Sequence, residues 1–268
     1  MADLLPDVRF KVAVASAKGG VGKSTATANL AVALARLGYA VGLMDADIYG
    51  PSQQMMMGID EKPYVDKHDH RLLPIQRHGV WVATLGALMD PDRPAVWRGP
   101  MLMKAIDQLI AGVRWGKLDY LLVDLPPGTG DVQLTLTQRI ALSGAVVVTT
   151  PQEVALVDAR KGIAMFKQVG VPILGILENM SYHLCARCGH EEAIFKRGGG
   201  RQMAERLGVP FLGEVPIDPD VVIGGDSGRP IVALAPDSAA ARTYVSAAHA
   251  VAGTLDPSKR PLTSRIED

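Results

Sequence analysis

The sequence predicts a three-layer α/β fold in which helices cover both faces of a mostly parallel central sheet. Two observations support this. Short apolar runs alternate with segments of helical periodicity along nearly the whole chain, and the first run leads through a glycine-rich turn straight into a helix. A chain of 268 residues with 48% hydrophobic content can bury a large core. We therefore expect one domain over residues 1–254 and a polar, mobile tail over residues 255–268.

Each element follows from a local pattern of apolar residues. The first helix is expected over residues 23–37, because Leu30, Leu34 and Leu37 recur at helical spacing and Gly38 is suited to end it. By similar patterns we expect strands at residues 12–15, 40–44, 71–75, 80–84, 118–124, 145–149, 173–177 and 211–215, and helices at residues 103–113, from 132, 154–169, 200–207 and 237–252.

The turn after the first strand has the composition of a phosphate-binding loop. Its glycines allow consecutive backbone N–H groups to converge on phosphate oxygens, and the following helix adds its positive N-terminal end. Lys23 is suited to reach the β- and γ-phosphates, and Ser24 to coordinate Mg²⁺. A dinucleotide-binding turn with Asp45 on a ribose is the alternative, although it has no need of Lys23 and Ser24. The expected nucleotide-binding residues of the loop are Gly19, Gly20, Val21, Gly22, Lys23, Ser24 and Thr25.

Acidic residues follow two of the expected strands. Asp45 and Asp47 come directly after residues 40–44, and Asp124 ends the strand at residues 118–124. Because the carboxyl ends of parallel strands share one edge of a sheet, these carboxylates are expected beside the phosphate-binding loop. Asp45 and Asp124 are suited to hold Mg²⁺ together with Ser24. The alternatives are a solvated turn after the first of these strands and a plain strand-to-helix loop after the second.

A second functional signal is the spacing of Cys185 and Cys188. A Cys-x-x-Cys turn brings two thiolates near one metal, but two ligands do not close a tetrahedral site. A symmetric dimer would supply four thiolates, enough for a [4Fe–4S] cluster or a zinc ion. Zinc-ribbon half-sites, dithiol redox pairs and incidental cysteines share this spacing and stay open as alternatives.

The overall composition argues against several other classes of function. The 28 basic and 28 acidic residues leave no net positive field to hold nucleic acid, so no nucleic-acid partner is expected. Residues 1–10 lack the pattern of a secretory signal, and no stretch is apolar and long enough to span a membrane. With 2 cysteines a disulfide framework is not expected either. We expect a cytoplasmic protein without a membrane partner.

Several motifs carry a family resemblance. The pattern Lys-Gly-Gly-Val-Gly-Lys-Ser at residues 18–24 resembles the deviant P-loop of the MinD, ParA and nitrogenase-iron-protein superfamily. Asp-Ile-Tyr-Gly-Pro-Ser at residues 47–52, Trp-Arg-Gly-Pro-Met at residues 97–101 and Asp-Leu-Pro-Pro-Gly-Thr-Gly-Asp at residues 124–131 resemble, in combination, the Mrp/ApbC group of iron–sulfur cluster carrier ATPases. The resemblance extends from Lys11 to about Ala252 and implies a P-loop NTPase fold over residues 1–254.

The resemblance also implies roles for particular residues. Lys18 would reach across an ATP-bound homodimer to the partner's nucleotide, Asp47 would orient the attacking water, and Asp124 would be the acid that holds Mg²⁺ through a water molecule. Asn179 would hydrogen-bond the adenine, with the segment containing Pro216 and Asp218 supplying backbone on its other side. Cys185 and Cys188 match the pair that bridges a labile [4Fe–4S] cluster between subunits, with zinc as an alternative occupant.

We therefore expect an ATP-hydrolysing, homodimeric iron–sulfur carrier that takes a cluster from a donor and delivers it to apo-proteins. The expected catalytic residues are Lys18, Lys23, Asp47 and Asp124. The main alternative is a MinD/ParA-type positioning switch that uses the same ATP dimer to act on membrane or DNA. A binding protein that never hydrolyses ATP is a third.

Overall fold

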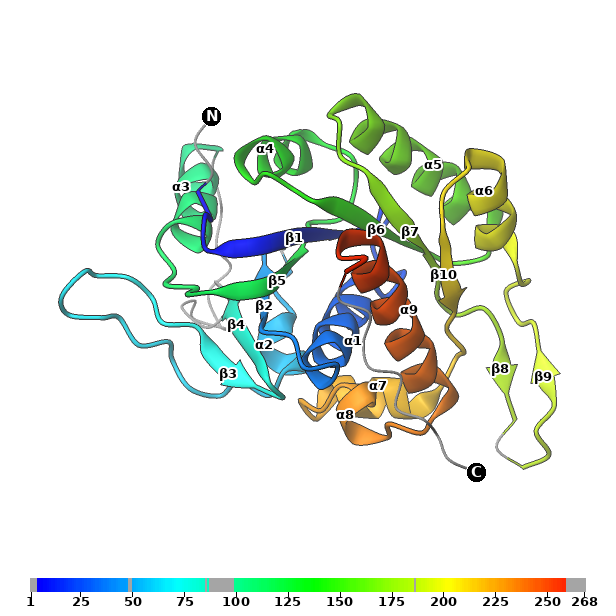
Figure 1. Cartoon of the computed structure of the whole chain (residues 1–268). Helices are drawn as coiled ribbons and strands as arrows, with labels where there is room; N and C mark the ends of the chain where they lie inside the picture. The colour runs from blue at the N-terminus through cyan, green and yellow to red at the C-terminus, as the bar shows by residue number, and fades with distance from the viewer. Residues whose placement is uncertain (1–3, 48–49, 85, 87–98, 186, 259–268) are drawn as a thin grey trace.

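The computed structural model describes residues 4–47, 50–84, 86, 99–185 and 187–258. The strands of its central sheet are β1 (Val8–Ala15), β2 (Val41–Asp45), β3 (Ile75–Arg77), β4 (Val80–Thr84), β5 (Leu118–Asp124), β6 (Gly144–Thr149), β7 (Ile173–Glu178) and β10 (Phe211–Glu214). Across the described part of the sheet they lie in the order β10-β7-β6-β1-β5-β2-β4-β3 (Figure 1). All neighbouring pairs are parallel except β3 and β4, so the predicted mostly parallel α/β fold is confirmed.

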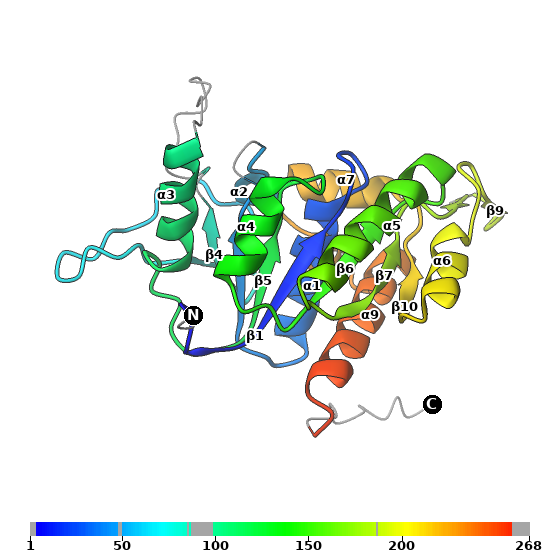
Figure 2. The same cartoon turned by 90° about the horizontal axis from the view of Figure 1, so that it is seen from above.

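Helices pack on both faces of this sheet. One face is covered by α1 (Lys23–Arg36), α8 (Ile231–Leu234) and α9 (Ala239–Leu255), and the other by α3 (Gly99–Ile110), α4 (Asp131–Arg139), α5 (Glu153–Gln168) and α6 (Gly199–Leu207) (Figure 2). The strands between these layers are apolar on both sides, and every residue of β2 and of β6 is buried. In the described part of the chain, no helix is both long and apolar enough to cross a membrane.

Two short helices lie near the edge where the parallel strands end. The first, α2 (Gln53–Met56), follows β2, and the second, α7 (Pro219–Asp226), follows β10 and contacts α2 (Figure 2). Asp218 begins α7 by accepting a hydrogen bond from the backbone N–H of Asp220 at 2.9 Å. The sequence does not predict α7 or α8, because helices of 8 and 4 residues show too little periodicity.

The predicted strand at residues 71–75 is wrong. Pro74 has no backbone N–H to donate, and the chain before it pairs elsewhere: Leu72 accepts a hydrogen bond from the N–H of Arg114 at 2.9 Å, beyond the end of α3. The strand begins only at Ile75, in β3. The helix predicted at residues 103–113 is confirmed, with bounds shifted toward the N-terminus.

The segment of chain that connects β7 to α6 forms a small antiparallel hairpin, which projects beyond the edge of the sheet (Figure 1). It consists of β8 (His183–Leu184) and β9 (Glu191–Glu192), and it carries the Cys-x-x-Cys turn between them. We call residues 182–197 the cysteine arm.

Candidate functional site

The carboxyl ends of three adjacent strands bring the predicted site residues together. Asp124 at the end of β5 is in register with Val14 on one side and with Asp45 on the other. The loop after β1 therefore lies beside both acidic strand ends, as the sequence predicts for an open parallel sheet.

The glycine-rich loop needs its glycines at two positions. Gly20 and Gly22 have φ values of 80° and 84°, in the region that side chains with a Cβ rarely adopt. A Cβ on Gly22 would also lie 2.1 Å from Nδ2 of Asn179. That Asn179 amide donates a hydrogen bond to the carbonyl of Val21 at 2.9 Å, so Asn179 supports the loop from the end of β7.

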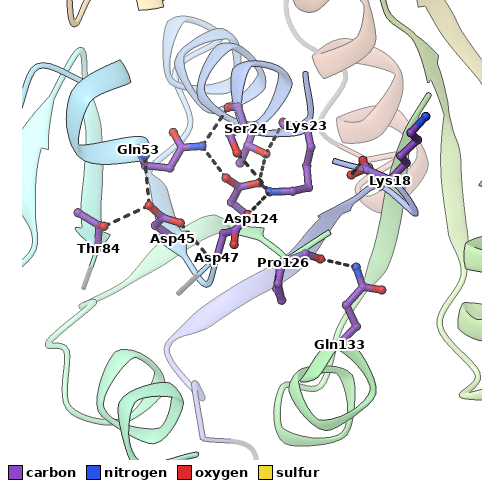
Figure 3. Close-up of polar contacts among 12 residues, drawn as sticks. Lys18, Lys23, Ser24, Asp45, Asp47, Gln53, Thr84, Asp124, Pro126 and Gln133 are labelled. Carbon is purple, nitrogen blue, oxygen red and sulfur yellow. Dashed lines mark hydrogen bonds and ion pairs between the residues drawn. The ribbon is translucent and has the colours of Figure 1, made fainter. Parts of the chain in front are cut away.

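Lys23 is buried among the predicted acidic residues. Its Nζ lies 2.7 Å from Oδ1 of Asp124 and 3.4 Å from Oδ2 of Asp47, and it donates a hydrogen bond to Oγ of Ser24 at 3.2 Å (Figure 3). A buried carboxylate needs an opposite charge or several hydrogen-bond donors, and Lys23 supplies the opposite charge and one hydrogen bond to Asp124.

Further donors hold the two buried carboxylates in place. Asp124 also accepts hydrogen bonds from Oγ1 of Thr27 at 3.0 Å and from Nε2 of Gln53 at 2.8 Å. Asp45 accepts one from Oγ1 of Thr84 at 3.1 Å and one from the backbone N–H of Gln53 at 3.1 Å. Both acids are therefore fixed in orientation.

Burial changes the acidity of this cluster. Burial, with a smaller contribution from the charge of Asp124, raises the pKa of Asp45 to about 7, although hydrogen bonds and Lys23 oppose the shift. Burial also raises the pKa of Asp47, against the attraction of Lys23.

The carboxylate and hydroxyl oxygens of this site are suitable ligands for Mg²⁺. Mg²⁺ prefers carboxylate and hydroxyl oxygens and usually takes one or two carboxylates, completing its shell with waters and phosphate oxygens. Ser24, Asp45 and Asp124 supply such oxygens, and all three residues contact Gln53 (Figure 3). Within the described residues no cluster of three or more His, Cys, Asp and Glu side chains forms a ready metal cage, which is the ordinary situation for a Mg²⁺ that is bound together with phosphates.

Two hollows lie near the carboxyl ends of the strands. One, of about 400 Å³, is lined by Asp47, Gly50, the two prolines after β5, and Gln133. The other, of about 360 Å³, lies between the loop and the base of the cysteine arm, and Lys18, Met180 and Phe195 are among its lining residues. Lys18 is exposed and stands apart from the carboxylates, so its predicted role across a dimer stays a prediction (Figure 3).

The segments predicted to hold an adenine lie next to one another. The backbone N–H of Val215 donates to the carbonyl of Glu178 at 2.8 Å, and that of Ser181 donates to Val215 at 3.0 Å. Asn179 and the buried Pro216 are thus neighbours at the ends of β7 and β10. In the structure Asp218 caps α7, and its predicted contact with a base stays a prediction.

The two cysteines lie on a tight turn at the tip of the cysteine arm. The N–H of Cys185 donates to His190 at 2.9 Å, and the N–H of Gly189 donates to Cys185 at 2.8 Å. Backbone N–H groups of Arg187 and Cys188, together with the Cys188 side chain, lower the pKa of the Cys185 thiol. Cys188 is exposed and Cys185 is half-buried, so both thiols are accessible.

The base of the cysteine arm is closed by a buried carboxylate. Glu178 has no exposed surface; Oε1 accepts hydrogen bonds from Oγ of Ser181 at 2.6 Å and from the N–H of Gly198 at 2.8 Å, and Oε2 accepts one from the N–H of Gly200. Glu178 therefore joins the start of the arm, its end and the first turn of α6. Arg197 adds an outer contact, because it pairs with Glu191 of β9 at 2.6 Å.

Comparison with known proteins identifies the family. A family model described as ParA, NUBPL iron-transfer P-loop NTPase, matches residues 7–252. The chain belongs to this family. Among its relatives, an iron-sulfur cluster carrier protein of Pseudomonas fragi is 50% identical over 241 residues, which are 90% of this chain and 84% of that protein. The expected resemblance to Mrp/ApbC-type carrier ATPases is confirmed.

Solved structures agree with the fold of these iron-transfer P-loop NTPases. A nucleotide-binding protein of Archaeoglobus fulgidus, solved in complex with ADP, is 40% identical, with a TM-score of 0.75 over 84% of this chain and 88% of that one. The cell division ATPase MinD of Pyrococcus furiosus is 24% identical, with a TM-score of 0.68 over 91% of this chain and 99% of that one. The second likeness shows the fold alone.

The sequence did not predict some residues that contact the candidate site or the cysteine arm. Thr27, one helical turn after Lys23, could have been found from that spacing. Gln53 and Thr84 carry no local signal, because the carboxylates that their side chains contact lie far away in the chain. Glu178 has one near partner, Ser181, but Gly198 and Gly200 lie 20 and 22 residues away. Of the family motifs, residues 48–49 and 97–98 lie outside the described residues, as do residues 259–268 of the predicted tail.

Proposed function

We propose that this iron-transfer P-loop NTPase is a cytoplasmic ATPase that carries a labile [4Fe–4S] cluster between two copies of the chain and delivers it to apo-proteins. The observation that carries the proposal is the pair Cys185 and Cys188, two accessible thiols on one tight turn. They make half of a four-thiolate site, which a second copy related by two-fold symmetry would complete.

The proposed mode of nucleotide binding is based on the glycine-rich loop and on the buried charges of Lys23 and Asp124. Backbone N–H groups of the loop from Gly19 to Gly22 and the N-terminus of α1 would bind the β- and γ-phosphates, and Lys23 would turn from Asp124 toward them. Bound Mg²⁺, held by Ser24, Asp45 and Asp124, would neutralise phosphate charge. The Archaeoglobus fulgidus relative was solved in complex with ADP, which supports nucleotide binding by this chain.

Hydrolysis needs a group that orients water toward the γ-phosphate. Asp47 is suited to this role, because its carboxylate lies 3.4 Å from Lys23 Nζ and lines an open hollow. Lys18, exposed at the start of the loop, would contact the nucleotide of the partner subunit. Asn179 and the chain at Pro216 and Asp218 would hold the adenine, since an amide offers both a donor and an acceptor.

The cysteine thiols would bind the iron–sulfur cluster that is carried. The lowered pKa of the Cys185 thiol favours the thiolate, which is the form that binds iron. Two thiolates from each subunit satisfy a [4Fe–4S] cluster at a position with open access for transfer to a recipient. Zinc would use the same four thiolates, so the identity of the bound metal has to be measured.

Anaerobic iron–sulfur reconstitution tests the proposal. Wild-type protein should take up about four irons and four sulfides per dimer and show the broad visible absorbance of a cluster. Cys185→Ser and Cys188→Ser should each lose the cluster and keep ATP binding, because the P-loop lies on other elements. The control is Glu192→Gln, which changes an exposed residue of strand β9 on the same arm without touching a thiol and should keep the cluster. About one zinc per dimer without sulfide, or a full cluster in either cysteine variant, would contradict the proposal.

A further inference from the structure

Gln53 is a fully buried residue at the centre of the nucleotide site, and neither the motifs nor the proposed function gives it a role. It is the first residue of α2, and its side chain has no exposed surface. Nε2 donates one hydrogen bond to Oδ2 of Asp124 at 2.8 Å and another to the backbone carbonyl of Ser24 at 2.9 Å (Figure 3). Both partners only accept, so the orientation of the amide is fixed: a flipped amide would face two oxygens with its own oxygen.

The backbone of the same residue holds the second buried acid. The N–H of Gln53 donates to Oδ2 of Asp45 at 3.1 Å, and Thr84 donates to that same oxygen at 3.1 Å. One residue therefore joins the glycine-rich loop, the end of β2 and the end of β5. The three residues that it contacts, Ser24, Asp45 and Asp124, are the ones with oxygens suited to Mg²⁺.

Packing alone does not account for an amide at this position. Oε1 of Gln53 is buried and accepts no hydrogen bond from any residue that the structure describes. Leaving a buried acceptor unpaired is unfavourable, and a methionine of the same length would fill the space without that cost. The amide is explained by what its Nε2 donates.

The two oxygens of Asp124 are held by different donors. Oδ1 accepts from Lys23 and Thr27, and Oδ2 accepts from Gln53. When Lys23 turns to a phosphate, as the proposed function requires, Oδ1 loses a charged donor. Thr27 and Gln53 then remain to hold the carboxylate plane.

We propose that Gln53 is a positioning residue that fixes the Asp124 carboxylate for Mg²⁺·ATP and ties α2 to the glycine-rich loop. The inference rests on the proposed ATPase function. Without the Nε2 donor, Asp124 can rotate and Mg²⁺·ATP is bound in more than one geometry, which weakens Mg²⁺ binding and slows hydrolysis.

The test compares Gln53→Met with Gln54→Met, which makes the same change one position along α2. The wild-type Gln54 is half-buried. Equilibrium binding of a fluorescent ATP analogue is measured with and without Mg²⁺, together with the Mg²⁺ concentration that gives half-maximal hydrolysis, kcat, and the melting temperature without nucleotide. Gln53→Met should bind the analogue without Mg²⁺ within about twofold of wild type, need about tenfold more Mg²⁺, and lose about tenfold in kcat, as expected for one hydrogen bond to a charged group. Gln54→Met should match wild type in all of these.

Two results would overturn the inference. If Gln53→Met folds and has the wild-type Mg²⁺ requirement and kcat, Gln53 only fills space, while the proposed ATPase function stands. If wild type itself neither binds nor hydrolyses Mg²⁺·ATP, the proposed function fails, and this inference fails with it. Should Gln53→Met not fold, Gln53→Asn is compared with Gln53→Leu. The two side chains are nearly equal in size, and only asparagine has an amide. The asparagine variant should need less Mg²⁺ than the leucine variant, and equal Mg²⁺ requirements would contradict the inference.

Discussion

Lys23 neutralises buried carboxylates in the fold, and the proposed function also assigns its charge to a phosphate. Its Nζ is the cation between Asp124 and Asp47, and both its own side chain and that of Asp124 are almost completely buried. Binding of a nucleotide would exchange one pair of anions for another around the same lysine, so the carboxylates must be held by other donors once Lys23 moves.

Lys23→Ala should therefore affect both nucleotide binding and stability. Removing one partner of a buried ion pair leaves an uncompensated charge, and we expect a loss of about 3–5 kcal/mol in the free energy of unfolding, with ATP binding abolished. Urea unfolding and nucleotide titration measure the two effects. Lys18→Ala, at an exposed position on the same loop, should leave stability unchanged; hydrolysis at the wild-type rate in Lys23→Ala would mean that the loop assignment is wrong.

Asp45 should make stability depend on pH. Its pKa is raised from 3.8 to about 7 in the folded chain, so the folded state holds its proton more tightly than the unfolded state. The stability that this group contributes is present at low pH and is lost as pH rises from about 4 to about 7.

Asp45→Asn removes that titration. Urea unfolding at pH 5 and pH 8, without Mg²⁺ or nucleotide, should show a smaller loss of stability with rising pH in the variant than in wild type. The comparison of slopes is insensitive to any constant cost of the new amide. Parallel pH profiles in the two proteins would show that Asp45 is ionised throughout.

At the scale of elements, the cysteine arm is held at its base more firmly than at its tip. Glu178 bonds to both ends of the arm and to the start of α6, whereas β8 and β9 are only two residues each. The neighbouring Asn179 supports the glycine-rich loop, so one strand end, that of β7, contacts both this loop and the base of the arm.

Glu178→Gln should loosen the arm without unfolding the sheet. The two carboxylate oxygens of Glu178 accept from the backbone N–H groups of Gly198 and Gly200. The amide nitrogen of glutamine cannot accept a hydrogen bond, so the variant loses one of these two contacts. Hydrogen exchange of peptides covering residues 179–200 should accelerate by about tenfold or more, the scale of one hydrogen bond to a charged group. Glu192→Gln, on the exposed strand β9, is the control and should exchange like wild type. Unchanged exchange in Glu178→Gln would show that the arm is held by other contacts.

The sequence could predict these elements only where the signal is local. The first helix was predicted to within one residue because Leu30 and Leu34 face the core at helical spacing and Gly38 ends it with a φ of 87°. The hairpin around Cys185 was not predicted, because two-residue strands show no periodicity. The contacts of Gln53 could not be predicted, since they join segments 29 and 71 residues apart.

At the scale of the whole molecule, the alternation of strands and helices was predictable because each buried parallel strand reads as a continuous apolar run. That order decides the site, since it places Asp45 and Asp124 beside the loop after β1. Pairing with a second copy of the chain is harder to predict, because the pattern of apolar residues in one chain does not show whether a symmetric partner binds.

Lys18→Ala tests that partner. If Lys18 contacts the nucleotide of the other subunit, the variant should bind a non-hydrolysable ATP analogue as a monomer but fail to form the ATP-dependent dimer in light scattering. Lys167→Ala is the control, since that lysine is exposed in the last turn of α5, whereas Lys18 shares a hollow with the first turn of that helix. A dimer that tightens normally in Lys18→Ala would show that the lysine is a solvated charge.

In the proposed function, two copies of this chain share one cluster through four cysteine thiolates. Native mass spectrometry of anaerobically reconstituted protein can test this sharing, because it gives the mass of the cluster and of the assembly together. We expect a dimer carrying about one [4Fe–4S] unit, which is absent in Cys188→Ser. A cluster on single chains, about two clusters per dimer, or a dimer holding only zinc would contradict it.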